Sequence, residues 1–159
     1  MSTLTDKLVT FRLGDDHFAA DVHAVERVLR YTVPTSVPDM PDYIEGVMDY
    51  LGRVVPVVNL RRRFELPSVE ARADTRTLVL NVSGEWIGVV VDSVTEVTPF
   101  DPAAVAPPPK LFRGLAREYL KGIVRHGDKL VIYLDVEQLL STTERIALGA
   151  AGVEALANG

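Results

Sequence analysis

The sequence predicts a mostly β fold made of two small β-barrels that share a core, with short helices and a helix at the C-terminus. Three observations lead to it: short runs with an apolar residue at every second position, turn residues between those runs, and a pattern that occurs twice along the chain. The chain has 159 residues, the size of one ordinary domain. A repeated unit of about 60 residues buries too little surface to be stable alone, so the two units are expected to share one core.

A β-hairpin is predicted at the N-terminus. Apolar residues alternate along residues 8–13 and again along 18–22, and Gly14, Asp15 and Asp16 supply turn chemistry between the two runs. The residues after the hairpin also show helical spacing, so either a short helix or a strand with a bulge follows it. These residues are Val22, Val25, Val28 and Leu29.

The pattern of the first hairpin returns later in the chain. At an offset of 69 Phe11 matches Leu80, and a second hairpin turns at Ser83 and Gly84. At an offset of 76 residues 46–60 match residues 122–136. The sequence therefore predicts a duplication with units at about 7–64 and 76–140, and it leaves an exchange of strands between the units open. The alternative is chance, because any two amphipathic hairpins resemble each other.

The remaining segments are predicted to be linkers and a helix. Residues 65–76 are polar and mixed in charge, which is typical of a solvated linker, and residues 99–109 hold five prolines, which favours a rigid internal loop. Near the C-terminus Ser141 and Glu144 form a capping-box pattern ahead of a helix over about 142–157. Its apolar stripe is Ile146, Ala150, Val153 and Leu156.

No motif for catalysis or for a bound cofactor is present. Cysteine is absent, and His17, His23 and His126 do not have the spacing of a metal site. Phosphate-binding loops and nucleophile elbows are also missing. A net charge of −5 argues against nucleic acid as a partner, and no apolar run is long enough to cross a membrane. We therefore expect a non-enzymatic protein without cofactor or metal and without direct membrane binding.

Two local features have more than one interpretation. The run Arg61, Arg62 and Arg63 indicates a short solvated helix, or else an anion-binding patch on a β-barrel that binds nucleic acid or small ligands. Trp86 is either an interface anchor or a part of the shared core.

Three segments carry a family resemblance. Residues 46–64, GVMDYLGRVVPVVNLRRRF, resemble the signature of the CheW-like domain, which has an Asn-Leu-Arg-Gly motif followed by an apolar run through Pro to Asp-Leu-Arg. Residues 86–97, WIGVVVDSVTEV, look like the family's Gly-hydrophobic-Val-Asp stretch, and residues 122–140 look like its closing strands and helix. The resemblance spans about residues 7–145.

The resemblance implies a fold and a function. The fold is two SH3-like five-stranded β-barrels around a shared core. The function is that of a non-catalytic adaptor that couples the cytoplasmic tips of chemoreceptors (methyl-accepting) to the regulatory domain of the histidine kinase CheA. Its place would be the cytoplasm, at receptor arrays on the inner face of the membrane. The resemblance favours a stand-alone coupling protein over the kinase or a member with a receiver domain.

The resemblance also implies two binding surfaces. A receptor-binding groove between the barrels is expected to include Val25, Val28, Val89 and Val91, although their parity fits burial in the core equally well. The kinase-binding surface is expected near Met48, Tyr50, Leu51 and Arg53.

The chain departs from the family pattern at two positions. Arg27 stands where the family has Glu, and Leu51 stands where it has Arg. An exposed charge pair contributes only about 0–1 kcal/mol to stability, so the fold should tolerate both changes. Binding depends more on such residues, which puts the kinase contact in doubt. The alternative is an accessory protein that binds receptors but not the kinase, and modulates array assembly or output.

Overall fold

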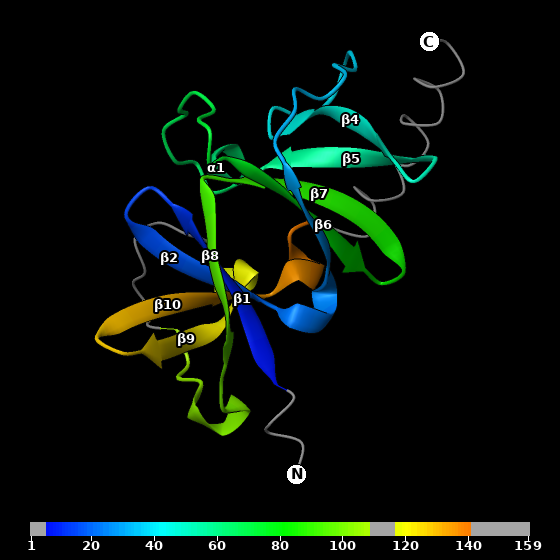
Figure 1. The fold of residues 1–159 in the computed structure, drawn as a ribbon. Helices are drawn as coiled ribbons and strands as arrows, with labels where there is room; N and C mark the ends of the chain where they lie inside the picture. The colour runs from blue at the N-terminus through cyan, green and yellow to red at the C-terminus, as the bar shows by residue number, and fades with distance from the viewer. Residues whose placement is uncertain (1–5, 109–116, 141–159) are drawn as a thin grey trace.

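The structure is a computed structural model of the chain, and it describes residues 6–108 and 117–140. Within these residues two five-stranded sheets make up most of the fold, which confirms the predicted mostly β class (Figure 1). The strands are β1 (Lys7–Leu13), β2 (Asp16–Asp21), β3 (Val25–Arg30), β4 (Ile44–Tyr50), β5 (Arg53–Asn59), β6 (Arg76–Val82), β7 (Glu85–Val91), β8 (Ser93–Pro99), β9 (Leu120–His126) and β10 (Lys129–Leu134). The helical turns are η2 (Val22–Ala24), α1 (Leu60–Arg63), η3 (Pro102–Ala104), η4 (Arg117–Tyr119) and η5 (Val136–Gln138).

The two sheets have the same plan. Sheet A has the order β8-β1-β2-β10-β9 and sheet B the order β3-β6-β7-β5-β4, so a shift of each strand label by five converts one order into the other. The registers agree as well, since Phe11 faces Phe18 in sheet A as Leu80 faces Ile87 in sheet B. Each sheet combines the first hairpin of one predicted unit with the last three strands of the other. This shared plan supports the duplication, which stays a prediction together with its boundaries.

The predicted hairpins are present. β1 and β2 join at Gly14 and Asp15, and β6 and β7 join at Ser83 and Gly84, whereas Asp16 already belongs to β2. After the first hairpin the chain makes the single turn η2 and then β3, whose pairing with β6 shifts between Val25 and Arg27. Of the two alternatives, the strand with a bulge is therefore the main element.

The main core lies between the sheets. Aromatic rings from sheet A and from the chain after α1 line up in it, with ring centroids 5.9 Å apart for Phe11 and Phe18 and 6.0 Å apart for Phe18 and Phe64. Two smaller clusters lie on the other faces of the sheets, because neighbouring side chains of a strand point to opposite sides. Leu8, Ala19, Val131 and Tyr133 form the cluster on sheet A, and Tyr50, Val55 and Val79 form the cluster on sheet B.

The strand pairing leaves both sheets open, because no ladder joins their edge strands within the described residues. In each sheet one isolated bridge links the segment after one edge strand to the other edge strand. Thr35, beyond β3, pairs with Val47 of β4, and Ala106, beyond β8, pairs with Ile123 of β9. Each bridge has two backbone hydrogen bonds of 2.8 to 2.9 Å. Closed SH3-like barrels are therefore not established. The predicted C-terminal helix over 142–157 lies outside the described residues.

Glycine is required where the backbone of Thr35 and of Ala106 passes close to the strand that it pairs with. A Cβ atom at Gly122 would lie 2.4 Å from the carbonyl oxygen of Ala106, and one at Gly46 would lie 2.1 Å from that of Thr35. Backbone atoms cannot move aside as a flexible side chain does. Both bridges therefore depend on the absence of a side chain at the equivalent position in β4 and β9.

No helix in residues 6–108 and 117–140 has the length and the apolar composition needed to cross a membrane.

We expect Gly122→Ala to lower the free energy of unfolding by about 2–3 kcal/mol, because the new methyl group overlaps a backbone carbonyl. Gly88→Ala is the matched control, since the nearest atoms to its Cβ would belong to side chains and not to the backbone: Met48 Cε and Thr77 Cγ2 at 3.1 Å and Val57 Cγ2 at 3.6 Å. Urea denaturation of both variants measures the difference. Equal destabilisation would show that the close approach at Gly122 does not constrain the fold.

Candidate functional site

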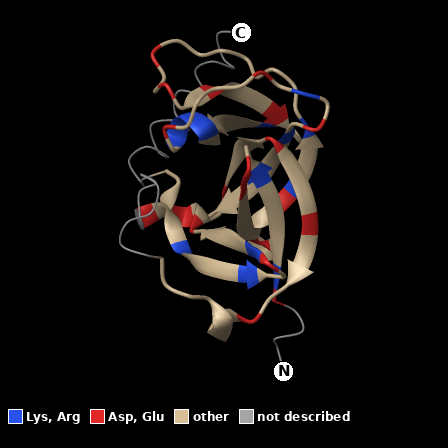
Figure 2. Ribbon diagram, turned by 90° about the vertical axis from the view of Figure 1, so that its left-hand side faces the viewer, with Lys and Arg blue, Asp and Glu red and all other residues tan. Residues whose placement is uncertain are grey.

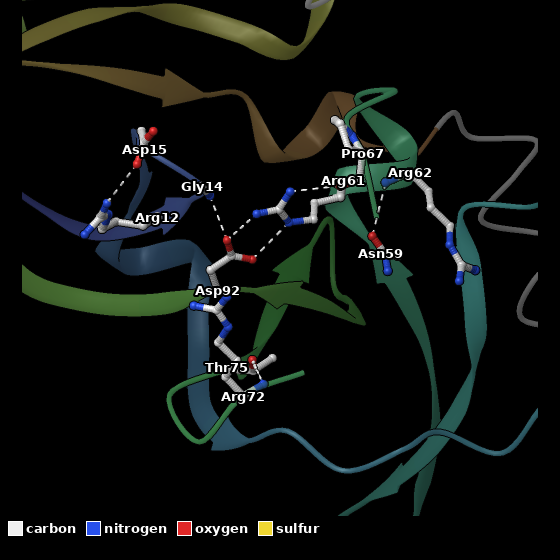
Figure 3. A network of polar contacts seen from close by, with 10 residues as sticks. All are labelled: Arg12, Gly14, Asp15, Asn59, Arg61, Arg62, Pro67, Arg72, Thr75 and Asp92. Atoms are coloured by element: carbon white, nitrogen blue, oxygen red, sulfur yellow. Dashed lines mark hydrogen bonds and ion pairs between the residues drawn. The ribbon is translucent and has the colours of Figure 1, made fainter. Parts of the chain in front are cut away.

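A polar contact joins the two sheets where the chain passes from one to the other (Figure 3). Asp92 lies between β7 of sheet B and β8 of sheet A. Its carboxylate accepts hydrogen bonds from Arg61 Nε at 3.1 Å and Arg61 Nη2 at 2.5 Å, and from the backbone N–H of Gly14 at 2.7 Å. Gly14 belongs to the β1–β2 turn, so one side chain ties α1 to the turn between two inner strands of sheet A. We call this contact the inter-sheet clasp.

Local sequence places Arg61 for this contact. Asn59 ends β5, and its side-chain oxygen accepts a hydrogen bond from the N–H of Arg62, which starts α1. Arg61 also donates from Nη1 to the carbonyl oxygen of Pro67 at 2.9 Å. The guanidinium is therefore held from both sides, and the side chain of Arg61 is only 13% exposed.

The clasp changes the acidity of Asp92. Partial burial alone would raise its pKa, but the hydrogen bonds from Arg61 and Gly14 and the positive charge of Arg61 outweigh burial. The pKa of Asp92 is therefore below its usual value, and the carboxylate is charged at neutral pH. Nearby, Glu45 accepts hydrogen bonds from Tyr31 Oη at 2.8 Å and Asn59 Nδ2 at 2.6 Å. Burial first, and then this contact with Glu45, raise the pKa of Tyr31 to about 12.

The linker predicted over residues 65–76 lies beside the clasp. It borders a polar cavity of about 290 Å³ beside the clasp, to which it contributes Arg72, Asp74 and Thr75. The backbone N–H of Arg72 donates to the Thr75 hydroxyl at 2.8 Å. The lining includes both acidic and basic residues, so it has no strong preference for a ligand of one charge.

The three consecutive arginines do not form a common basic patch. Although α1 is a blue turn in Figure 2, its guanidinium groups have different partners. Arg61 binds Asp92, Arg62 donates to the carbonyl oxygen of Asp42 at 3.2 Å, and Arg63 lies over the ring of Tyr43 at 4.1 Å. The prediction of a solvated helix is therefore wrong for Arg61, because structural contacts hold that side chain. The same contacts remove the geometric basis for an anion-binding patch.

The four valines predicted to line a receptor groove do not lie together on the surface. Val89 and Val91 are 1% and 0% exposed and belong to the main core, since their side of β7 faces the other sheet. Val25 is half-buried against the same core, and Val28 is 42% exposed. Only Val28 of the four is open to a partner.

An exposed valine that the groove prediction omitted lies at the matching position of sheet A. Val97 on β8 is 54% exposed, and it pairs with Val9 of β1 as Val28 pairs with Leu78 of β6. The sequence offset of 69 relates Val28 to Val97 and was the signal that could have found it. The neighbours of the two valines differ in charge: Arg27 is exposed on β3, whereas Glu96 on β8 lies 3.6 Å from His126.

The four residues predicted to bind the kinase do lie together, at the tip of the β4–β5 hairpin. Leu51 is in the turn with a φ of 51° and is 72% exposed. Arg53 lies over the Trp86 ring at 4.2 Å, and Trp86 contacts Tyr50 edge-on at 5.0 Å. Tyr50 is only 8% exposed and Met48 is half-buried in the same cluster, so both support the tip from below. Trp86 is part of this outer cluster, and not of the shared core.

Among residues 6–108 and 117–140, no group of three or more histidine, aspartate or glutamate residues is arranged to hold a metal ion. Partial burial lowers the pKa of His17, and the charges of Lys129 and Arg12 lower it further. His23 is exposed after β2, and His126 is next to Glu96 on another strand. The described surface offers apolar side chains and charges for binding a protein partner.

Comparisons with a family model, with related sequences and with a solved structure agree with one another. The model of the CheW-like domain matches residues 7–144. The chain is 32% identical to the chemotaxis protein CheW of Klebsiella aerogenes, over 89% of this chain and 86% of that protein. It is 34% identical to the protein FrzA of Myxococcus xanthus, over 87% of each. The crystal structure of the scaffolding protein TtCheW from Thermoanaerobacter tengcongensis has a TM-score of 0.81 and 28% identity, over 87% of this chain and 90% of that one.

Removing the carboxylate from the clasp should destabilise the fold. Asp92→Asn leaves Arg61 partly buried without its counter-charge, and we expect a loss of about 1–3 kcal/mol at pH 7. Asp15→Asn is the control, because Asp15 is fully exposed and lies 3.8 Å from Arg12. It should change the free energy of unfolding much less than Asp92→Asn does, because an exposed ion pair contributes little to stability. Urea denaturation measures both values, and equal losses would contradict the role of the clasp.

The stability that Asp92 contributes should decrease at low pH. Folding lowers the pKa of Asp92, so its contribution is complete above the ordinary value of 3.8 and is lost as the pH falls through the lower value of the folded state. The gap in stability between the wild type and Asp92→Asn should therefore narrow below about pH 4. A gap that stays constant as the pH falls well below about 4 would mean that the charge of Asp92 does not stabilise the fold.

Proposed function

This chain belongs to the CheW-like domain family, and on that premise we propose that it is a non-catalytic adaptor in a bacterial chemosensory array. It couples the cytoplasmic tips of chemoreceptors to the regulatory domain of the histidine kinase CheA, in the cytoplasm at the inner face of the membrane. Its sheets form two SH3-like barrels around the shared core. The names of its relatives, which are chemotaxis proteins and a scaffolding protein, support this role.

The proposed receptor surface consists of the exposed edge strands β3 and β8. The observation that carries it is the pair of exposed valines, Val28 and Val97, at equivalent positions of the two sheets. An amphipathic receptor helix presents apolar anchors of this kind along one face. Arg27 and Glu96 next to them would bind acidic and basic residues of the receptor, which sets the direction in which the helix lies.

The proposed kinase surface is the tip of the β4–β5 hairpin. Leu51 presents an apolar side chain to solvent, and Arg53 is stacked on Trp86 beside it. Apolar and aromatic residues next to an arginine are typical of the centre of a protein interface. The half-buried Met48 and the buried Tyr50 hold the tip in place and contribute little surface of their own.

A second candidate function is favoured by Leu51 itself. The family pattern has arginine at this position, and leucine cannot form the charged hydrogen bonds of an arginine. If the kinase requires that charge, the chain is an accessory member that binds receptors but not CheA and modulates array assembly or output. Titration of the protein against a receptor cytoplasmic fragment, and separately against the kinase regulatory domain, distinguishes the two functions.

In the coupling function, Leu51→Asp should weaken binding of the kinase regulatory domain by about 30-fold or more, because it buries an unpaired charge in the interface. Binding of the receptor fragment should not change. The variant should fold, since aspartate tolerates a positive φ better than leucine does. Val69→Asp is the control, because Val69 is 55% exposed and lies in the linker. Wild-type protein that binds the receptor but not the kinase would support the accessory function.

Val28→Asp should show the opposite selectivity. We expect it to weaken receptor binding by about 30-fold while kinase binding stays at the wild-type level, because the charge is introduced on β3 and not at the hairpin tip. Isothermal titration calorimetry of both partners measures this, again with Val69→Asp as the control. Unchanged receptor binding would remove β3 from the receptor surface.

A further inference from the structure

A β-bulge on β4 directs one carboxylate to the base of the β4–β5 hairpin. β4 is the outermost strand of sheet B (Figure 1), and its pairing with β5 shifts between Ile44 and Gly46, so Glu45 is the extra residue. The two oxygens of this carboxylate accept separate hydrogen bonds, Oε2 from Tyr31 Oη at 2.8 Å and Oε1 from Asn59 Nδ2 at 2.6 Å. Tyr31 follows β3, the opposite edge strand of the sheet, and Asn59 ends β5. One side chain therefore joins the two edges of sheet B and both strands of the hairpin.

These bonds hold a strand that has a neighbour on only one side. Opposite β5, the described residues give β4 one isolated bridge, in which Val47 and Thr35 exchange two backbone hydrogen bonds. Asn59 also caps α1, the helix that carries Arg61 of the inter-sheet clasp. Through Asn59, the base of the hairpin is thus connected to the helix that the clasp fixes to sheet A.

The same bulge in sheet A has different contacts. The pairing of β9 with β10 shifts so that Lys121 is the extra residue, and the sequence offsets relate Lys121 to Glu45 and Phe100 to Tyr31. Lys121 Nζ lies 5.2 Å from the centroid of the Tyr133 ring, and Phe100 packs edge-on against that ring at 5.5 Å. The carboxylate link is therefore a feature of sheet B, the sheet that carries the proposed kinase surface.

The link remains intact at physiological pH. Burial and the contact with Glu45 raise the pKa of Tyr31 to about 12, so its hydroxyl keeps the proton that it donates. Hydrogen bonds to a charged carboxylate are stronger than those between neutral groups. The turn with Leu51 lies six residues along β4 from Glu45, which is about 20 Å of extended strand. A tilt of about 10° at the base would thus move the tip by about 3 Å.

We infer that Glu45 is a positioning residue for the proposed kinase surface. It fixes the base of the β4–β5 hairpin, so that Leu51 and Arg53 at the tip are already oriented when the kinase binds. A hairpin that is ordered in advance loses less conformational entropy on binding, which raises the affinity. The identity of the partner rests on the proposed function, whereas the hold of Glu45 on the hairpin does not.

The first test compares binding of the two partners by isothermal titration calorimetry. Glu45→Ala should weaken binding of the kinase regulatory domain by about tenfold. Binding of the receptor fragment should stay within about twofold, because β3 with Val28 remains paired with β6. Glu45→Gln should recover most of the kinase affinity, since its amide accepts from Asn59 and donates to the Tyr31 oxygen. Lys121→Ala, at the equivalent bulge of sheet A, is the matched control and should leave kinase binding unchanged.

Tyr31→Phe separates positioning from a direct contact between Glu45 and the kinase. It removes the hydroxyl that donates to Glu45, and it should weaken kinase binding by about threefold in the wild type but not in Glu45→Ala. Equal weakening in both backgrounds, or no weakening in the wild type, would overturn the positioning role. If Glu45→Ala does not fold, Tyr31→Phe serves for the other measurements.

Hydrogen exchange of the whole chain without partners tests the hold on the hairpin by itself. The amide of Val47, which donates to the Thr35 carbonyl oxygen at 2.9 Å, should exchange about fivefold faster in Glu45→Ala, whereas the amides of the inner strand β6 should not change. Unchanged exchange at Val47 would overturn the inference, and so would faster exchange with wild-type kinase affinity. A wild type that binds no kinase would contradict the coupling function, and exchange at Val47 would then decide whether Glu45 holds the hairpin.

Discussion

Asp92 is the residue at which the chain leaves sheet B and enters sheet A, and its carboxylate is bound by groups from both sides of that passage. Arg61 comes from α1 at the end of β5, and the N–H of Gly14 comes from the β1–β2 turn. Burial of the apolar core holds the two sheets together, but the hydrophobic effect is not directional. Hydrogen bonds to a charged group depend on geometry and therefore fix an orientation. The clasp therefore constrains how the two sheets are oriented relative to each other.

The two sheets have the same strand order, but their equivalent hairpins carry different side chains. In sheet B the hairpin tip is built up from aromatic and large apolar residues, with Arg53 stacked on Trp86 and Leu51 exposed. In sheet A the equivalent hairpin has His126 and Lys129 in place of Tyr50 and Arg53, and the space below it is hollow. Backbone features such as the bridges beside Gly46 and Gly122 are common to both, because they depend on the chain path and not on the partner.

The two departures from the family pattern both lie on the surface. Arg27 is exposed on an edge strand and Leu51 is exposed in a turn, so neither side chain is needed for the core. Leucine at a φ of 51° adopts a backbone conformation that residues with a Cβ atom rarely take, which costs stability without adding packing. A surface residue kept at such a cost is consistent with a role in binding, and this agrees with the place of Leu51 in the proposed kinase surface.

The sequence by itself determined the hairpins, their turns and the family, because alternation of apolar residues and the chemistry of Gly14, Ser83 and Gly84 are local properties. It also placed Met48, Tyr50, Leu51 and Arg53 together, since a hairpin keeps neighbours in sequence close in space. Only the tertiary structure decided that Val89 and Val91 are buried while Val97 is exposed, because parity gives the face of a strand but not what covers that face. The partner of Arg61 was likewise decided by the fold, since Asp92 is distant in sequence and meets it only when the two sheets pack.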